Sequence, residues 1–175
     1  PILILLFVIY TDRLKEPISL VVLTFLLGCF LCLPAGLLNS LVMVDDNFSF
    51  LAGFTEETLK FLALYFYVKK NKAFDEPMDA IVYGCLISLG FATYENYDYV
   101  YNFEFEVPPL EVAAIRAISA IPLHGCCGIL MGYYFIFYHF RKKRIYLWYS
   151  LFIPISVHAF YNFLCDFYDY MVEVY

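Results

Sequence analysis

The sequence predicts an all-α protein, a polytopic bundle of about six transmembrane helices in a single domain over residues 1–175. Three observations lead to this prediction. Hydrophobic residues make up 63% of the chain and charged residues only 16%, whereas soluble domains carry about 25% charge. The mean hydropathy is +0.71. The apolar residues also fall into consecutive runs long enough to cross a bilayer, so the composition argues against a soluble domain and rules out a disordered chain.

The apolar runs define the helices in order. Residues 1–10 are apolar but too few to span, so we expect them to be the end of a truncated helix. Prolines are placed to open two of the later runs, at Pro17 and Pro77. The five longer runs cover residues 17–44, 49–68, 78–103, 110–140 and 145–166.

The fifth run, residues 110–140, is too long for one perpendicular helix. As a straight helix it would measure about 46 Å, against a hydrocarbon core of about 30 Å. We therefore expect it to tilt, to kink at Pro122 or to start outside the bilayer.

The basic residues orient the predicted bundle. Nine of them fall in alternate loops, on one face, which the positive-inside rule makes cytoplasmic: Arg13, Lys15, Lys69, Lys70, Lys72, Arg141, Lys142, Lys143 and Arg144. The intervening loops carry acids and no Lys or Arg, namely Asp45, Asp46, Glu104, Glu106 and Glu111. The sequence thus predicts an integral membrane protein whose basic loops are cytoplasmic.

Several polar residues remain inside the predicted spans. Ionisable groups there cost about 2.5–3.5 kcal/mol each on insertion scales, usually face the bundle interior and mark functional sites. These residues are Glu56, Glu57, Lys60, Glu95, Arg116, His124, His158 and Asn162.

Four of these residues, from four different spans, lie at a similar depth. At about 1.5 Å per residue, they lie about 20–26 Å in from the basic edge. The four are Glu56, Glu95, His124 and His158. This coincidence is the main reason to predict one site in the outer half of the membrane. A Glu–Lys pair or a lone His can instead serve only to hold helices together, and for Arg116 snorkelling to the outer interface is the better explanation.

Local spacing supports the prediction. Glu56 and Lys60 are four residues apart and share a helix face, which leaves the adjacent Glu57 pointing elsewhere. His158 and Asn162 have the same spacing and can face one substrate atom. A G-x-x-x-G motif at residues 128–132 permits close helix approach beside His124.

These residue types suit the hydrolysis of an amide bond. A carboxylate beside a second carboxylate can hold and deprotonate water. A His and an Asn amide can donate to the oxygen that becomes negative when water attacks a carbonyl. The expected mechanism is a Glu base with a His/Asn oxyanion hole and no cofactor. Zinc held by two Glu and two His is the alternative, although the sequence has no H-E-x-x-H motif.

At these residues the sequence resembles the PrsW-type intramembrane proteases, which are related to the CAAX prenyl endopeptidases and the bacteriocin-processing enzymes. The resemblance covers residues 50–165 and rests on five motifs. They are F-T-E-E-T-L-K at 54–60, F-D-E-P-M-D at 74–79, F-A-T-Y-E-N at 91–96, H-G-C-C-G at 124–128 and H-A-F-Y-N at 158–162.

The resemblance implies roles residue by residue. Glu56 and Glu57 match the Glu pair of the family, with Lys60 as the trailing base. His158 and Asn162 match the pair that forms the oxyanion hole in the CAAX-type relatives. Glu95 stands where those relatives carry a His, and His124 is a candidate to replace it. The F-D-E-P-M-D motif is far from the site, and we interpret it as helix-start chemistry.

The family also implies a substrate and a location. The expected activity is a glutamic-type intramembrane protease that cuts a single-span membrane protein, such as an anti-sigma factor, on its outer side. The expected partners are this substrate and the lipid bilayer, with no nucleic acid, and the expected location is a bacterial plasma membrane. The alternatives from other classes are a proton-coupled transporter or channel and a non-catalytic peptide-binding membrane protein.

Overall fold

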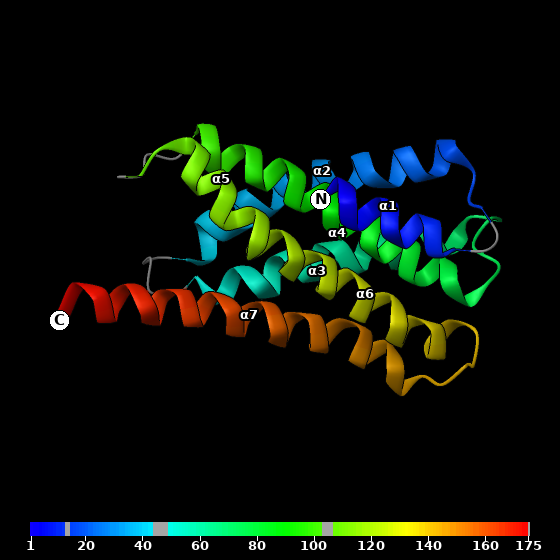
Figure 1. The fold of residues 1–175 in the computed structure, drawn as a ribbon. Coiled ribbons are helices and arrows are strands. Elements are labelled where there is room, and N and C mark those ends of the chain that lie inside the picture. Colours follow the sequence, from blue (N-terminus) through cyan, green and yellow to red (C-terminus); the bar gives the residue numbers. More distant parts are fainter. Residues whose placement is uncertain (13–14, 44–48, 103–106, 175) are drawn as a thin grey trace.

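The computed structural model describes residues 1–12, 15–43, 49–102 and 107–174, and these residues form helices and connecting segments without a strand (Figure 1). Five of the charges used above to orient the bundle lie outside the described residues, namely Arg13, Asp45, Asp46, Glu104 and Glu106. The α-helices are α1 (Ile2–Thr11), α2 (Ile18–Val42), α3 (Phe50–Phe66), α4 (Pro77–Tyr101), α5 (Pro109–Ile118), α6 (Ala120–His139) and α7 (Ile145–Val174). A short 3-10 helix, η2 (Val68–Lys70), follows α3.

The structure confirms the all-helical membrane bundle. Four segments are long and apolar enough to cross a bilayer: Ile18–Val42, Pro77–Tyr101, Pro109–His139 and Ile145–Tyr168. The third predicted span is the helix α3, which has 17 residues and is the shortest that can reach across a hydrocarbon core. The described residues form one α-helix more than the six expected, because the fifth run is divided in two.

The division of the fifth run occurs at Ser119. This residue ends α5 and precedes α6, with φ −118° and ψ −79°. The ring of Pro122 would clash with the carbonyl four residues earlier in a continuous helix. In the first turn of α6 that proline is tolerated, because the first four N–H groups of a helix have no intrahelical acceptor. The expected break therefore lies three residues before the proline itself.

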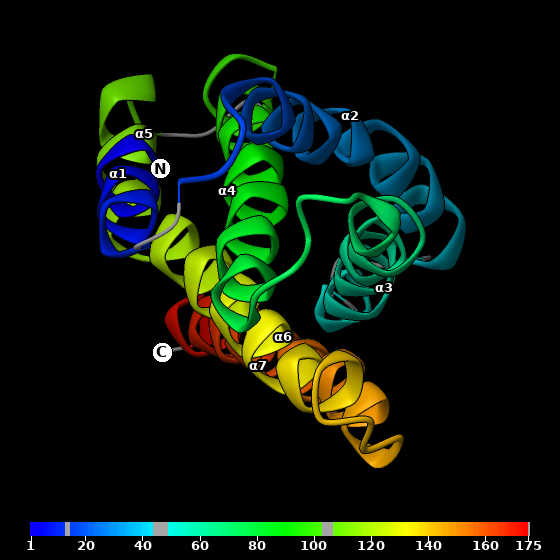
Figure 2. The ribbon, with the colours of Figure 1, turned by 90° about the vertical axis from the view of Figure 1, so that its right-hand side faces the viewer.

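The helix α4 is the centre of the bundle. It packs against α1, α2, α3, α5 and α6 (Figure 2), and its residues from Val82 to Ala92 are buried. Glycines allow this packing, because a Cβ added to Gly128 would lie 2.6 Å from the Gly84 carbonyl oxygen. A Cβ at Gly132 would likewise clash with the Ala80 backbone. The close approach predicted from the G-x-x-x-G motif is thus confirmed, and α4 is the partner helix.

The helix α7 lies along α3 and α6 on the other side of the bundle (Figure 1). Gly53 of α3 faces Ala159 of α7, where an added Cβ would lie 2.7 Å from a backbone nitrogen. The close contact holds the two helices in this register. Gly53 lies within one turn of Glu56, and Ala159 directly follows His158. Glu56 and His158 are thereby brought to the same level.

The F-D-E-P-M-D motif caps the start of α4, as predicted. Asp79 Oδ2 accepts hydrogen bonds from the backbone N–H groups of Asp75 and Glu76, both at 2.8 Å. The Glu76 side chain completes a capping box, in which two otherwise unsatisfied backbone donors gain acceptors.

Candidate active site

Three charged side chains of α3 are buried together. Glu56, Glu57 and Lys60 are at most 4% exposed, because they face the packed interior between α2, α4 and α7. Lys60 Nζ lies 2.7 Å from Glu57 Oε1 and 3.8 Å from Glu56 Oε2. The expectation that Glu57 points elsewhere is wrong, because residues three and four positions before Lys60 both lie on its face of the helix.

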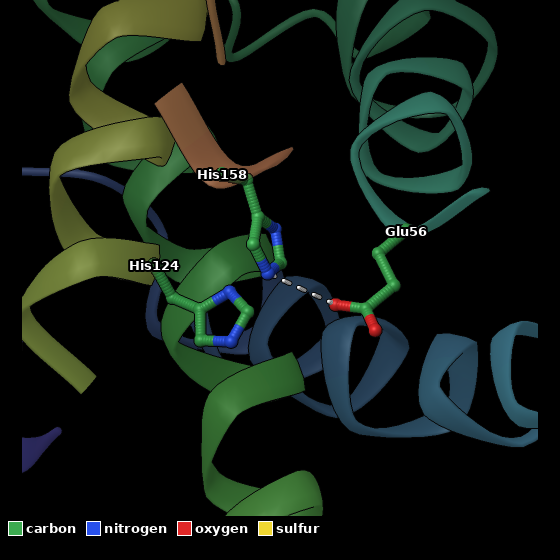
Figure 3. Close-up of side chains that lie close together, drawn as sticks. All are labelled: Glu56, His124 and His158. Atoms are coloured by element: carbon green, nitrogen blue, oxygen red, sulfur yellow. Dashed lines mark ion pairs between the residues drawn. The ribbon is translucent and has the colours of Figure 1, made fainter. Parts of the chain in front are cut away.

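His158 of α7 reaches both carboxylates. Its Nδ1 is 3.0 Å from Glu57 Oε1, and its Nε2 is 3.9 Å from Glu56 Oε2 (Figure 3). The ring also stands edge-on to that of His124 on α6, with centroids 4.8 Å apart. Glu56, His124 and His158 thus point toward one another from three helices.

His124 extends the network to α4. Its Nδ1 is 2.9 Å from Lys60 Nζ, and its Nε2 is 3.0 Å from Glu95 Oε2. An ammonium group can only donate, so His124 Nδ1 accepts a hydrogen bond from Lys60. The proton of the ring is therefore on Nε2, which donates a hydrogen bond to Glu95. The structure therefore brings together the residues predicted to share one depth, although their catalytic roles stay predictions.

Arg116 of α5 extends this network beyond Glu95. Its guanidinium is 2.6 Å from Glu95 Oε2, donates to Asn96 Oδ1 at 3.2 Å and lies over the Tyr99 ring at 3.8 Å. The interpretation of Arg116 as a snorkelling residue is wrong. The Arg116 guanidinium pairs with Glu95 instead of extending to the interface, and α5 packs against α4.

Sequence reasoning missed Asn39 of α2. Its Nδ2 donates to Glu56 Oε1 at 3.2 Å, and its own Oδ1 accepts from the Thr55 hydroxyl. The available signal was an amide three residues before the last residue of α2, a helix that carries no charged side chain. A neutral amide in a span is consistent with many interhelical contacts, so this signal alone does not indicate a site residue.

Asn162 lies near the site without joining the network. Its Nδ2 donates to the Ser49 carbonyl oxygen at 3.0 Å, at the start of α3. Within the described residues, no hydrogen bond links Asn162 to the buried carboxylates or imidazoles. Its present contact joins α7 to α3, one turn beyond His158.

The same residues form a group that could hold a metal ion. One ligand atom each from Glu56, His124 and His158 lies within 4.8 Å of the others, and all three side chains are buried. Glu56 Oε2 and Glu57 Oε2 are buried and have no hydrogen-bond partner. Imidazole and carboxylate ligands suit zinc, although both ring nitrogens of His124 already have hydrogen-bond partners, Lys60 and Glu95.

The fold and the site together define a class of protein. Spanning helices enclose two adjacent carboxylates, two imidazoles and a lysine, with carboxylate oxygens left free to accept from water. Buried ionisable groups of this kind mark a functional site in a membrane protein, and the residue types suit an intramembrane hydrolase.

Comparison with known proteins identifies the family. Residues 16–175 match the family described as PrsW family intramembrane metalloprotease. The chain is 38% identical to Protease PrsW of Clostridioides difficile over 94% of its length and 75% of that relative. It is 35% identical to Protease PrsW of Geobacillus kaustophilus, over 85% of the chain and 68% of that relative. It is also 35% identical to Protease PrsW of Bacillus subtilis, over 86% of the chain and 71% of that relative.

The chain belongs to the PrsW family, and it is an intramembrane protease of bacteria. Its substrate is accordingly embedded in the membrane. No solved structure matches it significantly. The family membership favours the protease over the transporter and the peptide-binding scaffold, which share buried carboxylates but not this ancestry.

Proposed function

We propose that Glu56 is the general base that activates the water for peptide hydrolysis. The observation that carries this proposal is the environment of its two oxygens. Oε1 accepts from Asn39, while Oε2 is buried, lacks a hydrogen-bond partner and faces His158 Nε2 at 3.9 Å. A carboxylate held at one oxygen and free at the other can accept a proton from water in a fixed direction.

Glu57 has a different part in this proposal. Its Oε1 accepts from both the Lys60 ammonium and His158 Nδ1, so its charge is already compensated on that side. We assign Glu57 the orientation of Lys60 and His158, with its bare Oε2 available as a second acceptor for the attacking water. The Glu95–His124 contact fixes the imidazole that in turn accepts from Lys60.

The oxyanion donors in this proposal are His158 and Asn162, as the family resemblance implies. His158 stands at the carboxylates already. The Asn162 amide donates to a backbone carbonyl, that of Ser49, and would turn to donate to the scissile carbonyl of the substrate. Donors aimed at the developing oxyanion contribute about 2.7–4 kcal/mol each to the stabilisation of the transition state.

A metal-assisted form of the same hydrolysis is the second candidate, because the Glu56, His124 and His158 ligand atoms are close together. These three residues would hold the ion, and zinc would lower the pKa of water and polarise the carbonyl. In this form His124 would give up one of its two present partners, Lys60 or Glu95. The description of the family as metalloproteases supports this candidate.

We further propose that the substrate is a single-span membrane protein, such as an anti-sigma factor, cut on its outer side in the bacterial plasma membrane. The predicted depth of the site, about 20–26 Å from the basic edge, supports the side. The basic loops that follow α3 and α6 support their cytoplasmic location by the positive-inside rule.

The test is incubation of the purified chain with a single-span reporter protein, with and without a chelator, followed by added zinc. Glu56→Gln should lower the cleavage rate by about 10²–10⁴-fold, the usual contribution of a positioned base. Glu111→Gln, at an exposed position of α5, is the matched control and should cleave normally. Full activity of the Glu56 variant would contradict the assignment of the base, and loss on chelation with recovery on zinc would select the metal-assisted form.

A further inference from the structure

An apolar groove opens between α3 and α7, away from the candidate active site. Its volume is about 160 Å³. Aromatic and aliphatic side chains line it, namely Phe61, Leu62, Tyr65, Phe66, Leu147, Trp148 and Leu151. Phe66 and Trp148 are each 55% exposed, so the groove faces the surroundings of the bundle rather than its interior.

The groove lies at the basic end of the bundle. It is built from the last turns of α3 and the first turns of α7, and the α6–α7 turn lies at this same end (Figure 1). Leu151 precedes His158 by about two helical turns, roughly 10 Å. The groove is therefore at a different depth from the carboxylates.

Two lysines contact aromatic rings that line the groove. Lys69 Nζ lies 3.4 Å from the centroid of the Tyr65 ring, and Lys70 Nζ lies 5.8 Å from that of Phe66. Both rings line the groove. Among the described residues, neither lysine has a carboxylate within ion-pair distance, so two positive charges meet an apolar slot without a counter-ion.

We propose that this groove binds an anionic phospholipid, with an acyl chain along the aromatic lining and the phosphate at Lys69 and Lys70. An apolar slot ending in basic residues at a membrane interface is complementary to the junction of acyl chain and charged headgroup in an anionic lipid. Trp148 and Tyr65 suit that level, where amphipathic aromatic side chains concentrate. A substrate helix ending at the same level would carry its own Lys and Arg there, so charge favours the lipid.

The chain provides its own reporter for this proposal, because Trp148 is its one tryptophan. The full chain is reconstituted in phosphatidylcholine vesicles that contain a small, fixed fraction of a lipid with brominated acyl chains. Bromine quenches tryptophan fluorescence on contact. Brominated phosphatidylglycerol should quench Trp148 several-fold more strongly than the same fraction of brominated phosphatidylcholine, and high salt should weaken this preference. Equal quenching by the two lipids would overturn the proposal.

Matched lysine variants distinguish binding at this groove from a general electrostatic attraction of anionic lipid to the basic loops. Lys70→Gln should reduce the preference for the anionic lipid by about fivefold, from about 1 kcal/mol per basic residue near an anionic headgroup. Lys69→Gln should act similarly, and Lys70→Arg should retain the preference. Lys72→Gln, an exposed neighbour in the same loop, should also retain it. An equal loss in the Lys72 and Lys70 variants would overturn the site, because it would assign the effect to overall charge.

Discussion

Two groups of buried and partly buried carboxylates lie at different levels of this bundle, and they are stabilised in different ways. At the candidate site, Glu57 and Glu95 accept from the cations Lys60 and Arg116. At the basic end, Asp79 accepts from two backbone N–H groups and Glu16 accepts from the Tyr83 hydroxyl. The first group is a network of side chains from several helices, whereas the second holds the start of α4 in place.

The comparison shows which feature distinguishes a candidate site from a structural cap. A buried oxygen without a partner does not do so, because Asp79 Oδ1 shares that property with Glu56 Oε2 and Glu57 Oε2. The distinguishing feature is the presence of imidazoles and an ammonium group around the free oxygens. Only the first group can therefore both hold water and move a proton.

The largest expected effect comes from removing the central cation. Lys60→Met leaves Glu57 buried without its partner at 2.7 Å, and breaking a buried ion pair from one side destabilises a protein by about 3–5 kcal/mol. We expect a large fall in the unfolding midpoint in a denaturing-detergent titration, together with loss of cleavage.

The double variant Glu57→Gln/Lys60→Met sharpens this prediction. Removing both charges relieves the uncompensated carboxylate, so much of the lost stability should return, while cleavage should stay low. A double variant as unstable as Lys60→Met alone would show that packing, rather than the charge pair, accounts for the loss.

Removing the support of Glu56 should have a smaller effect. Asn39→Leu deletes the donor to Glu56 Oε1, and loss of such an orienting partner typically lowers activity by about 10–100-fold. Because Asn39 positions Glu56 without touching substrate, we expect kcat to fall with little change in KM. Asn39→Asp, which places a carboxylate beside Glu56, should also displace the pH profile of cleavage.

The control for Asn39 is its neighbour on α2. Ser40 is exposed, and its hydroxyl donates to the Leu37 carbonyl of its own helix. Ser40→Ala should leave both kcat and KM unchanged. A fall in thermal stability without a change in kcat for Asn39→Leu would show that the amide only joins α2 to α3.

The sequence predicted the levels of some site residues along the bundle but not all of their contacts. Counting residues from the basic loops placed His158 and Glu56 correctly at one level, because α7 and α3 are uninterrupted up to those positions. For Arg116 the sequence favoured snorkelling, whereas in the structure its guanidinium pairs with Glu95. Asn39 could not be ranked from sequence, since a neutral amide in a span is consistent with many interhelical contacts.

At the basic end, the structural cap should affect stability alone. Asp79→Ala removes the acceptor of the Asp75 and Glu76 N–H groups, and loss of a helix cap costs about 1 kcal/mol. Thermal unfolding should occur at a lower temperature, while the cleavage rate per folded molecule should be that of the unmodified chain. A loss of cleavage without a loss of stability would show that the carboxylates at the basic end also take part in the reaction.

The smallest expected effect is a pH dependence at Glu16, which lies just before α2. Burial raises the pKa of Glu16 from 4.5 to about 7. The Tyr83 hydroxyl opposes this rise, whereas the nearby Asp79 and Asp12 add to it. The folded state thus binds this proton more tightly than the unfolded state does. Its stabilising contribution is present below pH 4.5 and is lost as the pH rises through about 7.

Unfolding midpoints measured across this range should therefore fall toward neutral pH, and Glu16→Gln should flatten part of that dependence. The change should be modest, because the carboxyl remains partly exposed to solvent. Glu111→Gln, at an exposed position of α5, is the control and should keep the full slope. An unchanged slope in the Glu16 variant would mean that another group at the basic end takes up the proton, and the cap at Asp79 would then be the first place to look.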